Sequence, residues 1–334
     1  MAELSPPRPE VAEAAPRIWS IVASATALGA ICHKDADGDT LGSALAFRFA
    51  LQPLGKRVSV VASPPVPQAW WFLPGIETVN ATSLPSGGPL FIFDSTGPER
   101  AGIHADTVRR APVVVNIDHH ISNPGFGSVD LVITEAASTG EIVFDLLKAW
   151  KVQIPPEAAA NLYATILSDT GGFRHDNTSE RALRAAAELV SLGADPALIA
   201  RGLFKSRPAS TLRMQGRILQ SLHFECGDRL VWGAITQADL RDTGALTEQA
   251  DGAIDQLNTV RGEEIAILFK QVSPVLTKVS IRTREQVDAA ALAAEFGGGG
   301  HRRASGLELE VPLSEAEGRV LQAARRVLGC PEPD

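Results

Sequence analysis

The stretch LGAICHKDADGDTLGS, residues 28–43, joins a short apolar run to a dense group of acidic side chains. Leu28–Cys32 has the length and composition of a buried strand, and Thr40–Leu54 has the pattern of a helix that ends at Gly55. The loop between them places one histidine and three aspartates at alternate positions: His33, Asp35, Asp37 and Asp39. Because ionised carboxylates this close together repel one another, the stretch predicts a strand, a cation-binding loop and a helix.

The same alternation of short apolar runs and helical patterns continues to about residue 190. The further predicted strands are Arg57–Ala62, Leu90–Phe93 and Val113–Ile117, and the further predicted helices are Ser138–Trp150 and Pro156–Leu167. Continuous apolar runs are typical of strands buried on both faces. Alternating strands and helices favour a mostly parallel sheet flanked by helices, so the sequence predicts the α/β class.

Polar motifs follow three of these predicted strands. They are His33–Asp39 after the first strand, Asp94 after Leu90–Phe93, and Asp118-His119-His120 after Val113–Ile117. Ligands of parallel sheets bind beyond the carboxyl ends of the strands. We therefore expect the three motifs to meet in one site.

The pattern changes after residue 191 and predicts a second, smaller α/β domain. Leu198–Phe204 and Thr211–Leu222 have helical patterns and are interpreted as a connector. The first residues are rich in Pro, Ala and Glu without a periodic apolar pattern, which predicts a disordered tail. The expected division is a tail over 1–15, a catalytic domain over 16–191, a helical connector over 192–222 and a substrate-binding domain over 223–332.

The bulk composition is that of a core-forming protein. Of its 334 residues 45% are hydrophobic, and the formal net charge of −8 argues against binding to long duplex nucleic acid. Three scattered cysteines are too few for a disulfide framework, so a reduced, cytoplasmic setting is expected. The apolar run Ile18–Cys32 is too short and too interrupted to span a membrane, and the acidic segment before it argues against a signal peptide.

The acidic motifs have the ligand types of a two-metal hydrolytic site. Mixed imidazole and carboxylate ligands suit Mn²⁺, with Mg²⁺ or Co²⁺ as substitutes, and two such ions about 3.5–4 Å apart hold a water that attacks phosphorus. Gly38 is expected to turn the backbone so that Asp37 and Asp39 face different ions. Asp94 becomes a bridging ligand in this interpretation, whereas taken alone it would be a turn cap.

Three further segments carry candidate residues. Asp118 can orient an imidazole of the adjacent histidines, the alternative being that these are exposed loop residues. Asp169 begins the segment DTGGFRHD, where Arg174 is a candidate phosphate clamp. The run Gly297–Gly300, followed by three basic residues, predicts either a phosphate nest or a flexible loop. Trp70, Trp71 and Phe72 are interpreted as core packing rather than as base-stacking residues.

In this order, the motifs HKDADGDTLGS, Asp94, DHH, DTG and GGGGH resemble the DHH/DHHA1 phosphoesterase superfamily, and most of all its bifunctional oligoribonuclease (nanoRNase) and pAp phosphatase group. The resemblance implies an N-terminal DHH domain and a C-terminal DHHA1 domain. It implies that His33 and Asp37 bind one Mn²⁺, that Asp39, His119 and Asp169 bind a second, and that Asp94 bridges them. It also implies catalytic roles for Asp118 and for His120, which would protonate the leaving oxygen.

The same resemblance assigns the substrate to the second domain. It implies that the nucleotide end is bound by Arg282, Gly299, Gly300 and His301, and that members form dimers. Arg302 replaces a common proline and could add a phosphate contact, Ala36 replaces another proline, and Asp35 is an additional carboxylate that is not expected to bind metal.

The function expected from these features is hydrolysis of very short nucleotides. Candidate substrates are RNA oligomers of a few nucleotides, linear dinucleotides such as pApA, cyclic dinucleotides and pAp. A RecJ-type single-strand exonuclease is the first alternative, although it should need a broad basic channel. An inorganic pyrophosphatase is disfavoured by the GGGGH segment, and a catalytically silent nucleotide sensor is disfavoured because every expected ligand is present.

Overall fold

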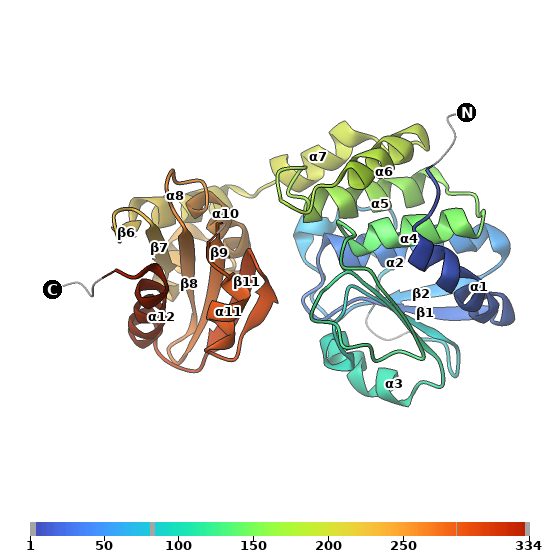
Figure 1. The fold of residues 1–334 in the computed structure, drawn as a ribbon, viewed down its shortest axis with the longest axis horizontal. Coiled ribbons are helices and arrows are strands. Elements are labelled where there is room, and N and C mark those ends of the chain that lie inside the picture. Colours follow the sequence, from blue (N-terminus) through green and yellow to red (C-terminus); the bar gives the residue numbers. More distant parts are fainter. Residues whose placement is uncertain (1–4, 81–83, 285, 331–334) are drawn as a thin grey trace. The chain divides into compact units, whose positions relative to one another are not determined.

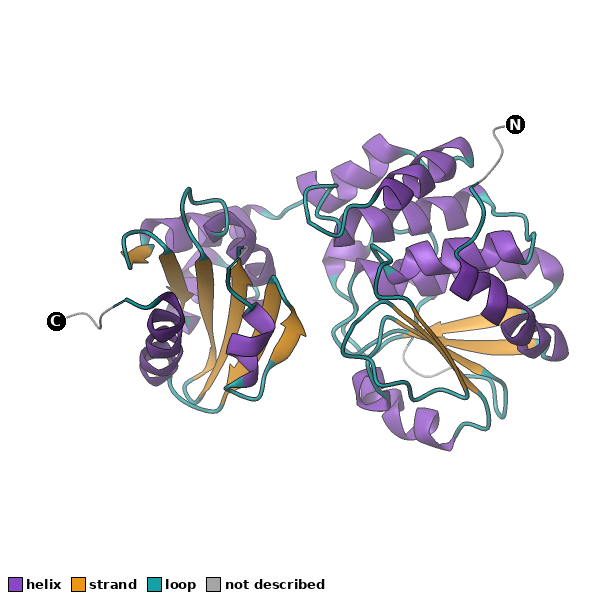
Figure 2. Cartoon of the chain, viewed as in Figure 1, coloured by secondary structure: helices purple, strands orange, loops and turns teal. Residues whose placement is uncertain are grey.

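The computed structural model describes residues 5–80, 84–284 and 286–330. The chain divides into two compact units, unit 1 up to Ser206 and unit 2 from Arg207 (Figure 1). Both contain a sheet covered by helices (Figure 2). The predicted α/β class with a second, smaller α/β domain is confirmed. Among the described residues, no helix is long and apolar enough to cross a membrane.

The sheet of unit 1 has five parallel strands in the order β2-β1-β3-β4-β5. The strands are β1 (Ala27–Ile31), β2 (Arg57–Val61), β3 (Leu90–Phe93), β4 (Val114–Asp118) and β5 (Val129–Val132). The first four lie where the sequence predicts them. β1, β3 and β4 are short, mostly apolar runs that are buried on both faces, whereas the edge strand β2 begins at the exposed Arg57. β5 was not predicted, since its residues alternate between buried and exposed over only four positions.

Helices cover both faces of this sheet. They are α1 (Pro9–Ser24), α2 (Gly38–Leu51), α3 (Ala105–Arg110), α4 (Thr139–Ala149), α5 (Pro156–Asp169), α6 (Glu180–Ser191) and α7 (Pro196–Lys205), with the short 3₁₀ helices η1 (Gln52–Leu54), η2 (Gln68–Trp70), η3 (Ile76–Thr78) and η4 (Pro98–His104). In Figure 1, α2, α4 and α5 lie on one side and α3 on the other. α2 is buried almost all round because α4 and α5 pack against it.

The first described residues lead directly into a helix, α1, which begins at Pro9. Its buried residues Val11, Ala15, Ile18 and Val22 follow one another at intervals of three or four, so they form a single apolar stripe on the helix. The predicted disordered tail over 1–15 is therefore wrong for residues 9–15. The composition hid the stripe because alanines and glutamates separate its members. Residues 1–4 lie outside the described residues.

Unit 2 is built on a mixed six-stranded sheet in the order β10-β11-β9-β8-β7-β6. The strands are β6 (His223–Glu225), β7 (Leu230–Ile235), β8 (Ile265–Ser273), β9 (Leu276–Thr283), β10 (Gly299–His301) and β11 (Ala304–Leu309). The helices are α8 (Ala209–Gln220), α9 (Gln237–Thr243), α10 (Ile254–Leu257), α11 (Ala289–Ala294) and α12 (Leu313–Leu328), with the 3₁₀ helix η5 (Thr247–Ala253). α11 and α12 pack on one face of the sheet, and α8 and α10 on the other.

Two expectations about the chain differ from the structure. The predicted connector over 192–222 is divided, because α7 packs within unit 1 and α8 within unit 2. The cysteines are also not all reduced: Cys226, in the turn after β6, is bonded to Cys330, just after α12, with their Cα atoms 5.6 Å apart. The sequence does not indicate this pair, because the two cysteines are 104 residues apart. Cys32 is free and buried.

Candidate metal centre

The candidate site lies at the carboxyl ends of three neighbouring strands of unit 1. His33 follows β1, Asp94 follows β3, and Asp118 ends β4 immediately before His119 and His120. Because β1, β3 and β4 are adjacent and parallel, their ends bring these side chains to one edge of the sheet. Asp94 has a φ of 59°, an unusual conformation for a non-glycine residue that turns the chain sharply there.

One group of potential ligands consists of His33, Asp37 and Asp94, whose ligand atoms lie within 4.8 Å of one another. The Nε2 atom of His33 is 3.5 Å from Oδ1 of Asp37 and 3.4 Å from Oδ2 of Asp94. His33 and Asp94 are buried, whereas the neighbouring Asp35 is exposed and belongs to no such group among the described residues.

A second group consists of Asp39, His119 and Asp169. Nε2 of His119 lies 3.3 Å from Oδ2 of Asp169, 3.8 Å from Oδ2 of Asp39 and 3.5 Å from Oδ1 of Asp94. Asp94 thus directs one oxygen to each group, Oδ2 to His33 and Oδ1 to His119. This is the arrangement expected of a carboxylate shared by two cations.

The helix termini fix the orientation of the acidic side chains. Asp37 is the N-cap of α2 and accepts hydrogen bonds from the backbone N–H groups of Asp39 and Thr40. Asp39 accepts hydrogen bonds from the N–H groups of Thr139 (2.7 Å) and Gly140 (3.0 Å) at the start of α4. Two helix N-termini therefore meet the carboxylates, which places partial positive charge at the site.

Gly38 does not act as the sequence suggested. It is the first residue of α2 rather than a turn residue, and its φ is not positive. A Cβ atom at this position would overlap the ring of Trp70. Glycine is needed here because the indole packs directly against the loop that carries Asp37 and Asp39.

The electrostatics of the two groups fit divalent cations. Burial raises the pKa of Asp39 and of Asp169, and neighbouring carboxylates add to this effect. Burial lowers the pKa of His33, but Asp37 and Asp94 outweigh it and raise it to about 10. The metal-free site therefore retains protons at neutral pH, as expected where carboxylates are crowded without cations. The set of carboxylate oxygens and imidazole nitrogens suits Mn²⁺, Mg²⁺, Co²⁺ or Zn²⁺.

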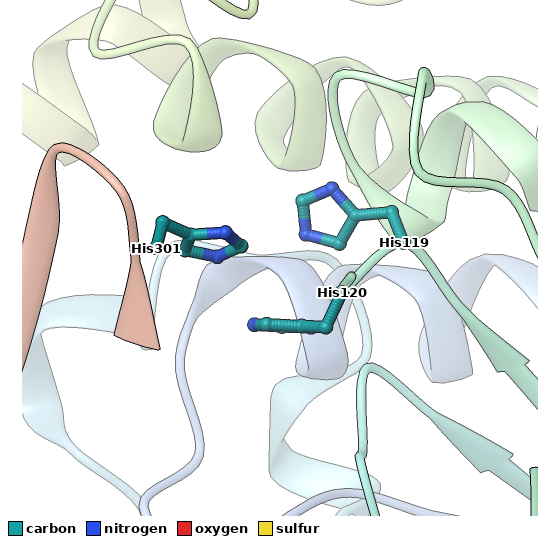
Figure 3. A group of neighbouring side chains, drawn as sticks. All are labelled: His119, His120 and His301. Carbon is teal, nitrogen blue, oxygen red and sulfur yellow. The ribbon is translucent and has the colours of Figure 1, made fainter. Parts of the chain in front are cut away.

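The two histidines have different partners, and Figure 3 shows both rings extending from the same loop. Nδ1 of His119 lies 3.1 Å from the carbonyl oxygen of Ala136, so Nε2 is the nitrogen that faces the carboxylates. Nδ1 of His120 lies 2.7 Å from Oδ1 of Asp118. Burial lowers the pKa of His120, but Asp118 and Asp94 outweigh this effect and raise it above its usual value.

Asp118 is fully buried, and both of its oxygens are engaged. Oδ1 also accepts hydrogen bonds from the N–H groups of His119 and His120, and Oδ2 accepts one from Nδ2 of Asn123 at 2.6 Å. This pattern suits a residue that orients His120 better than one that binds a cation. Asn123 was missed by sequence reasoning, because an asparagine in a loop carries no signal of its own.

A buried ionic network supports the start of α4. Arg8 pairs with Glu141 (2.7 Å) and Asp145 (2.8 Å), and Glu141 accepts a hydrogen bond from the N–H of Ala137. Ala136, next to Ala137, provides the oxygen that contacts His119. The N-terminal segment is thus linked to a candidate metal ligand through one short loop.

We expect Arg8→Met to weaken both folding and metal binding. The substitution leaves Glu141 buried with an unpaired charge, which should lower the free energy of unfolding by about 3 kcal/mol. Loosening the loop that orients His119 should weaken Mn²⁺ binding by about 10- to 100-fold. Denaturant titration and Mn²⁺ titration measure the two effects.

Arg181→Met is the matched control, because Arg181 pairs with Asp145 but not with Glu141. It should change stability without changing Mn²⁺ affinity. Equal Mn²⁺ affinities for Arg8→Met and the wild type would contradict the proposed link.

The predicted substrate residues fall in both units. Arg174 lies in the turn after α5, where its Nε donates a hydrogen bond to the carbonyl oxygen of Gly171. In unit 2 the second half of the glycine run, Gly299 and Gly300, forms β10 together with His301 and pairs with β11, whereas Gly297 and Gly298 remain in the turn before it. Ala304 of β11 is paired with His301 on one side and with Arg282 on the other, so these two residues lie in one row across three strands. Gly299 and Gly300 precede His301 on β10, and Arg302 follows it in the turn.

Comparisons with known proteins identify the family to which this architecture belongs. Residues 29–167 match the model of the DHH family N-terminal domain, and residues 233–329 match that of the DHHA1 domain. A Thermus thermophilus protein named bifunctional oligoribonuclease and PAP phosphatase NrnA is 36% identical over 300 residues, which cover 89% of this chain and 88% of the relative. The chain belongs to the DHH/DHHA1 phosphoesterase family.

Solved structures show the same fold for this DHH/DHHA1 protein. An exopolyphosphatase-related protein from Bacteroides fragilis superposes with a TM-score of 0.86 at 22% identity, covering 95% of this chain and 96% of that one. RecJ of Thermus thermophilus, solved in complex with Mn²⁺, superposes with a TM-score of 0.56 at 15% identity, covering all of this chain and 56% of RecJ. The DHH domain thus corresponds to unit 1 and the DHHA1 domain to unit 2.

Proposed function

We propose that the protein is a metal-dependent phosphoesterase that hydrolyses very short oligoribonucleotides and dinucleotides to mononucleotides, and pAp to AMP. The observation that carries this proposal is the shared carboxylate of Asp94, with one oxygen toward each of two groups of potential ligands. The relative named oligoribonuclease and PAP phosphatase supports the substrate class.

The proposed ligand sets follow the two groups of side chains. His33 and Asp37 would hold one ion, Asp39, His119 and Asp169 the other, and Asp94 both. Mn²⁺ is the favoured ion because the ligand set mixes imidazole and carboxylate groups, and the RecJ structure with Mn²⁺ supports it. When bound, such ions polarise a phosphoryl oxygen and supply a nucleophile at neutral pH.

The protein's own groups would complete the chemistry. Asp118 fixes the proton on Nδ1 of His120, so proton transfer to the leaving oxygen would occur from Nε2. The N-termini of α2 and α4 would stabilise negative charge on the phosphoryl group. In unit 2, the row containing Arg282 and His301 offers cationic and imidazole donors for the nucleotide end. We further propose a homodimer located in the cytoplasm, and this location does not rest on the cysteines, since Cys226 and Cys330 are bonded.

A substrate panel tests the proposal. The protein is incubated with Mn²⁺ and, separately, with pApA, pAp, a 24-nucleotide RNA and pyrophosphate, and the products are separated by chromatography. We expect rapid hydrolysis of pApA and pAp and slow attack on the long RNA. Cleavage of pyrophosphate alone would contradict the proposal, and equally fast digestion of the long RNA would favour a RecJ-type exonuclease.

Metal binding should release protons and strengthen as pH rises. His33 is protonated in the metal-free protein, since its pKa is raised to about 10, and the pKa of His119 is raised by Asp169 and Asp94 against the effect of burial. A cation binds the neutral imidazole, so each displaced proton should increase Mn²⁺ affinity by up to about tenfold per pH unit. Calorimetry between pH 6.5 and 8.5, in buffers of different ionisation enthalpy, measures the protons released. A Mn²⁺ affinity independent of pH would contradict the ligand assignment.

A further inference from the structure

Aromatic side chains pack against two segments of the candidate metal centre within unit 1. At one end, the ring of Trp70 packs on Gly38, between Asp37 and Asp39. The ring centroid of Trp70 lies 6.2 Å from that of Phe72, and Phe72 in turn packs on Gly202 of α7. Both rings are half-buried against the core, in agreement with the packing role that the sequence predicts for them. The same prediction is wrong for Trp71, which is 62% exposed.

Phe204, also on α7, differs from Trp70 and Phe72 in its exposure. It lies on α7, two residues beyond Gly202, and 37% of it is exposed. A Cβ atom at Gly172 would lie 3.3 Å from the ring, so Phe204 contacts the turn that follows Asp169. A partly exposed aromatic ring therefore lies against the turn that follows the potential metal ligand Asp169.

Arg174 completes this exposed surface. The centre of its guanidinium group lies 5.9 Å from the centroid of the Phe204 ring, and its Nε is held by the carbonyl oxygen of Gly171. This hydrogen bond fixes the guanidinium plane instead of leaving the side chain to move freely. The turn itself is unusual, since Gly171, Gly172 and Phe173 all have positive φ values. A sharply bent backbone therefore places a cationic plane and an aromatic ring together, five residues beyond Asp169.

We propose that Phe204 and Arg174 form a stacking platform for a nucleobase of the substrate, an inference that rests on the proposed function. Aromatic rings and guanidinium planes bind bases by their faces, which are common to all bases. A phosphate held by metal ions at the carboxylates would place its nucleoside toward the turn that follows Asp169, which Phe204 contacts. The platform would make the enzyme prefer nucleotides over base-free phosphates, with little selection among the four bases. Arg174 would then contact the base rather than clamp a phosphate.

The direct test compares binding of AMP and of ribose 5-phosphate in the presence of Mn²⁺ by calorimetry. The wild type should bind AMP about 5- to 100-fold more tightly than ribose 5-phosphate. Phe204→Leu, which keeps an apolar side chain but removes the ring, should reduce this ratio to near one. Arg174→Lys, which keeps the charge but removes the plane, should reduce the ratio severalfold. Unchanged ratios in both variants would overturn the proposal.

Phe224→Leu is the matched control, because Phe224 is an exposed phenylalanine on β6, at the opposite edge of its sheet from β10. Its ratio of AMP affinity to ribose 5-phosphate affinity should equal that of the wild type. A fall of this ratio as large as in Phe204→Leu would overturn the proposal. Thermal melting confirms that the variants are folded. If Phe204→Leu does not fold, the affinity ratio of Arg174→Lys tests the proposal by itself. That variant should fold, because Arg174 is an exposed turn residue.

Hydrolysis of pApA separates this proposal from the proposed function. Wild-type protein that hydrolyses pApA but shows no preference for AMP over ribose 5-phosphate retains the function and loses the platform. Protein that binds AMP through Phe204 but leaves pApA, pAp and short RNA intact retains the platform and loses the function.

Discussion

Replacing Asp94 with asparagine should reduce kcat/KM for pApA by at least about 10³-fold. The amide keeps the shape of the side chain but removes the charge shared by both groups of potential ligands. Oδ2 faces His33 at 3.4 Å, and Oδ1 faces His119 at 3.5 Å while accepting a hydrogen bond from Thr139. The substitution should therefore weaken the binding of both ions at once, and the Mn²⁺ content per chain should fall together with the activity.

Asp35→Asn is the matched control for this prediction. Asp35 is an acidic residue of the same loop, but it is exposed and lies outside both ligand groups. Its activity and Mn²⁺ content should stay within about twofold of the wild type, as is usual for exposed substitutions away from a site. If Asp94→Asn retained two Mn²⁺ ions per chain and more than a tenth of the activity, Asp94 would not be the shared ligand.

Replacing Asp118 with asparagine should lower kcat by about 10²- to 10⁴-fold while leaving two Mn²⁺ ions bound. Asp118 holds Nδ1 of His120 at 2.7 Å and raises the pKa of that imidazole. The proposed acid must be protonated to act, and a neutral amide would lower its pKa. The decline of kcat at alkaline pH should therefore move to lower pH in the variant, which a pH–rate profile measures.

His120→Ala tests the same proton transfer through the leaving group. With pApA, the variant should lose about as much activity as Asp118→Asn. With a p-nitrophenyl phosphodiester, whose leaving oxygen needs no proton, the loss should be at least about tenfold smaller. Equal losses on both substrates would show that His120 does not act as the acid.

Local sequence signals predicted the part of the site that lies at strand ends. β1 and β3 are short apolar runs followed within two residues by His33 and Asp94, and the mostly apolar β4 ends at Asp118. These features are visible because strand, turn and functional side chain lie within a few consecutive residues. The parallel arrangement of the strands then brings distant residues to one edge, such as His33 and Asp94, which are 61 positions apart in the sequence.

Contacts that depend on packing were not predictable from the sequence. Asp39 is hydrogen-bonded to Thr139, 100 residues away, because α2 and α4 pack side by side. Arg8 reaches Glu141 across 133 residues, and no local pattern pairs one buried charge with another at that distance. Gly38 was misjudged for the same reason, since its role is set by the ring of Trp70 and not by its own backbone.

The bond between Cys226 and Cys330 has a mechanical consequence. It closes most of unit 2, from the turn after β6 to the end of α12, into a covalent ring that spans 104 positions. A pulling force applied between the two ends of the chain would pass across this bond and would not stretch the residues inside the ring. Roughly 350 Å of extended chain would stay hidden from a single-molecule stretching experiment, and would appear only after reduction.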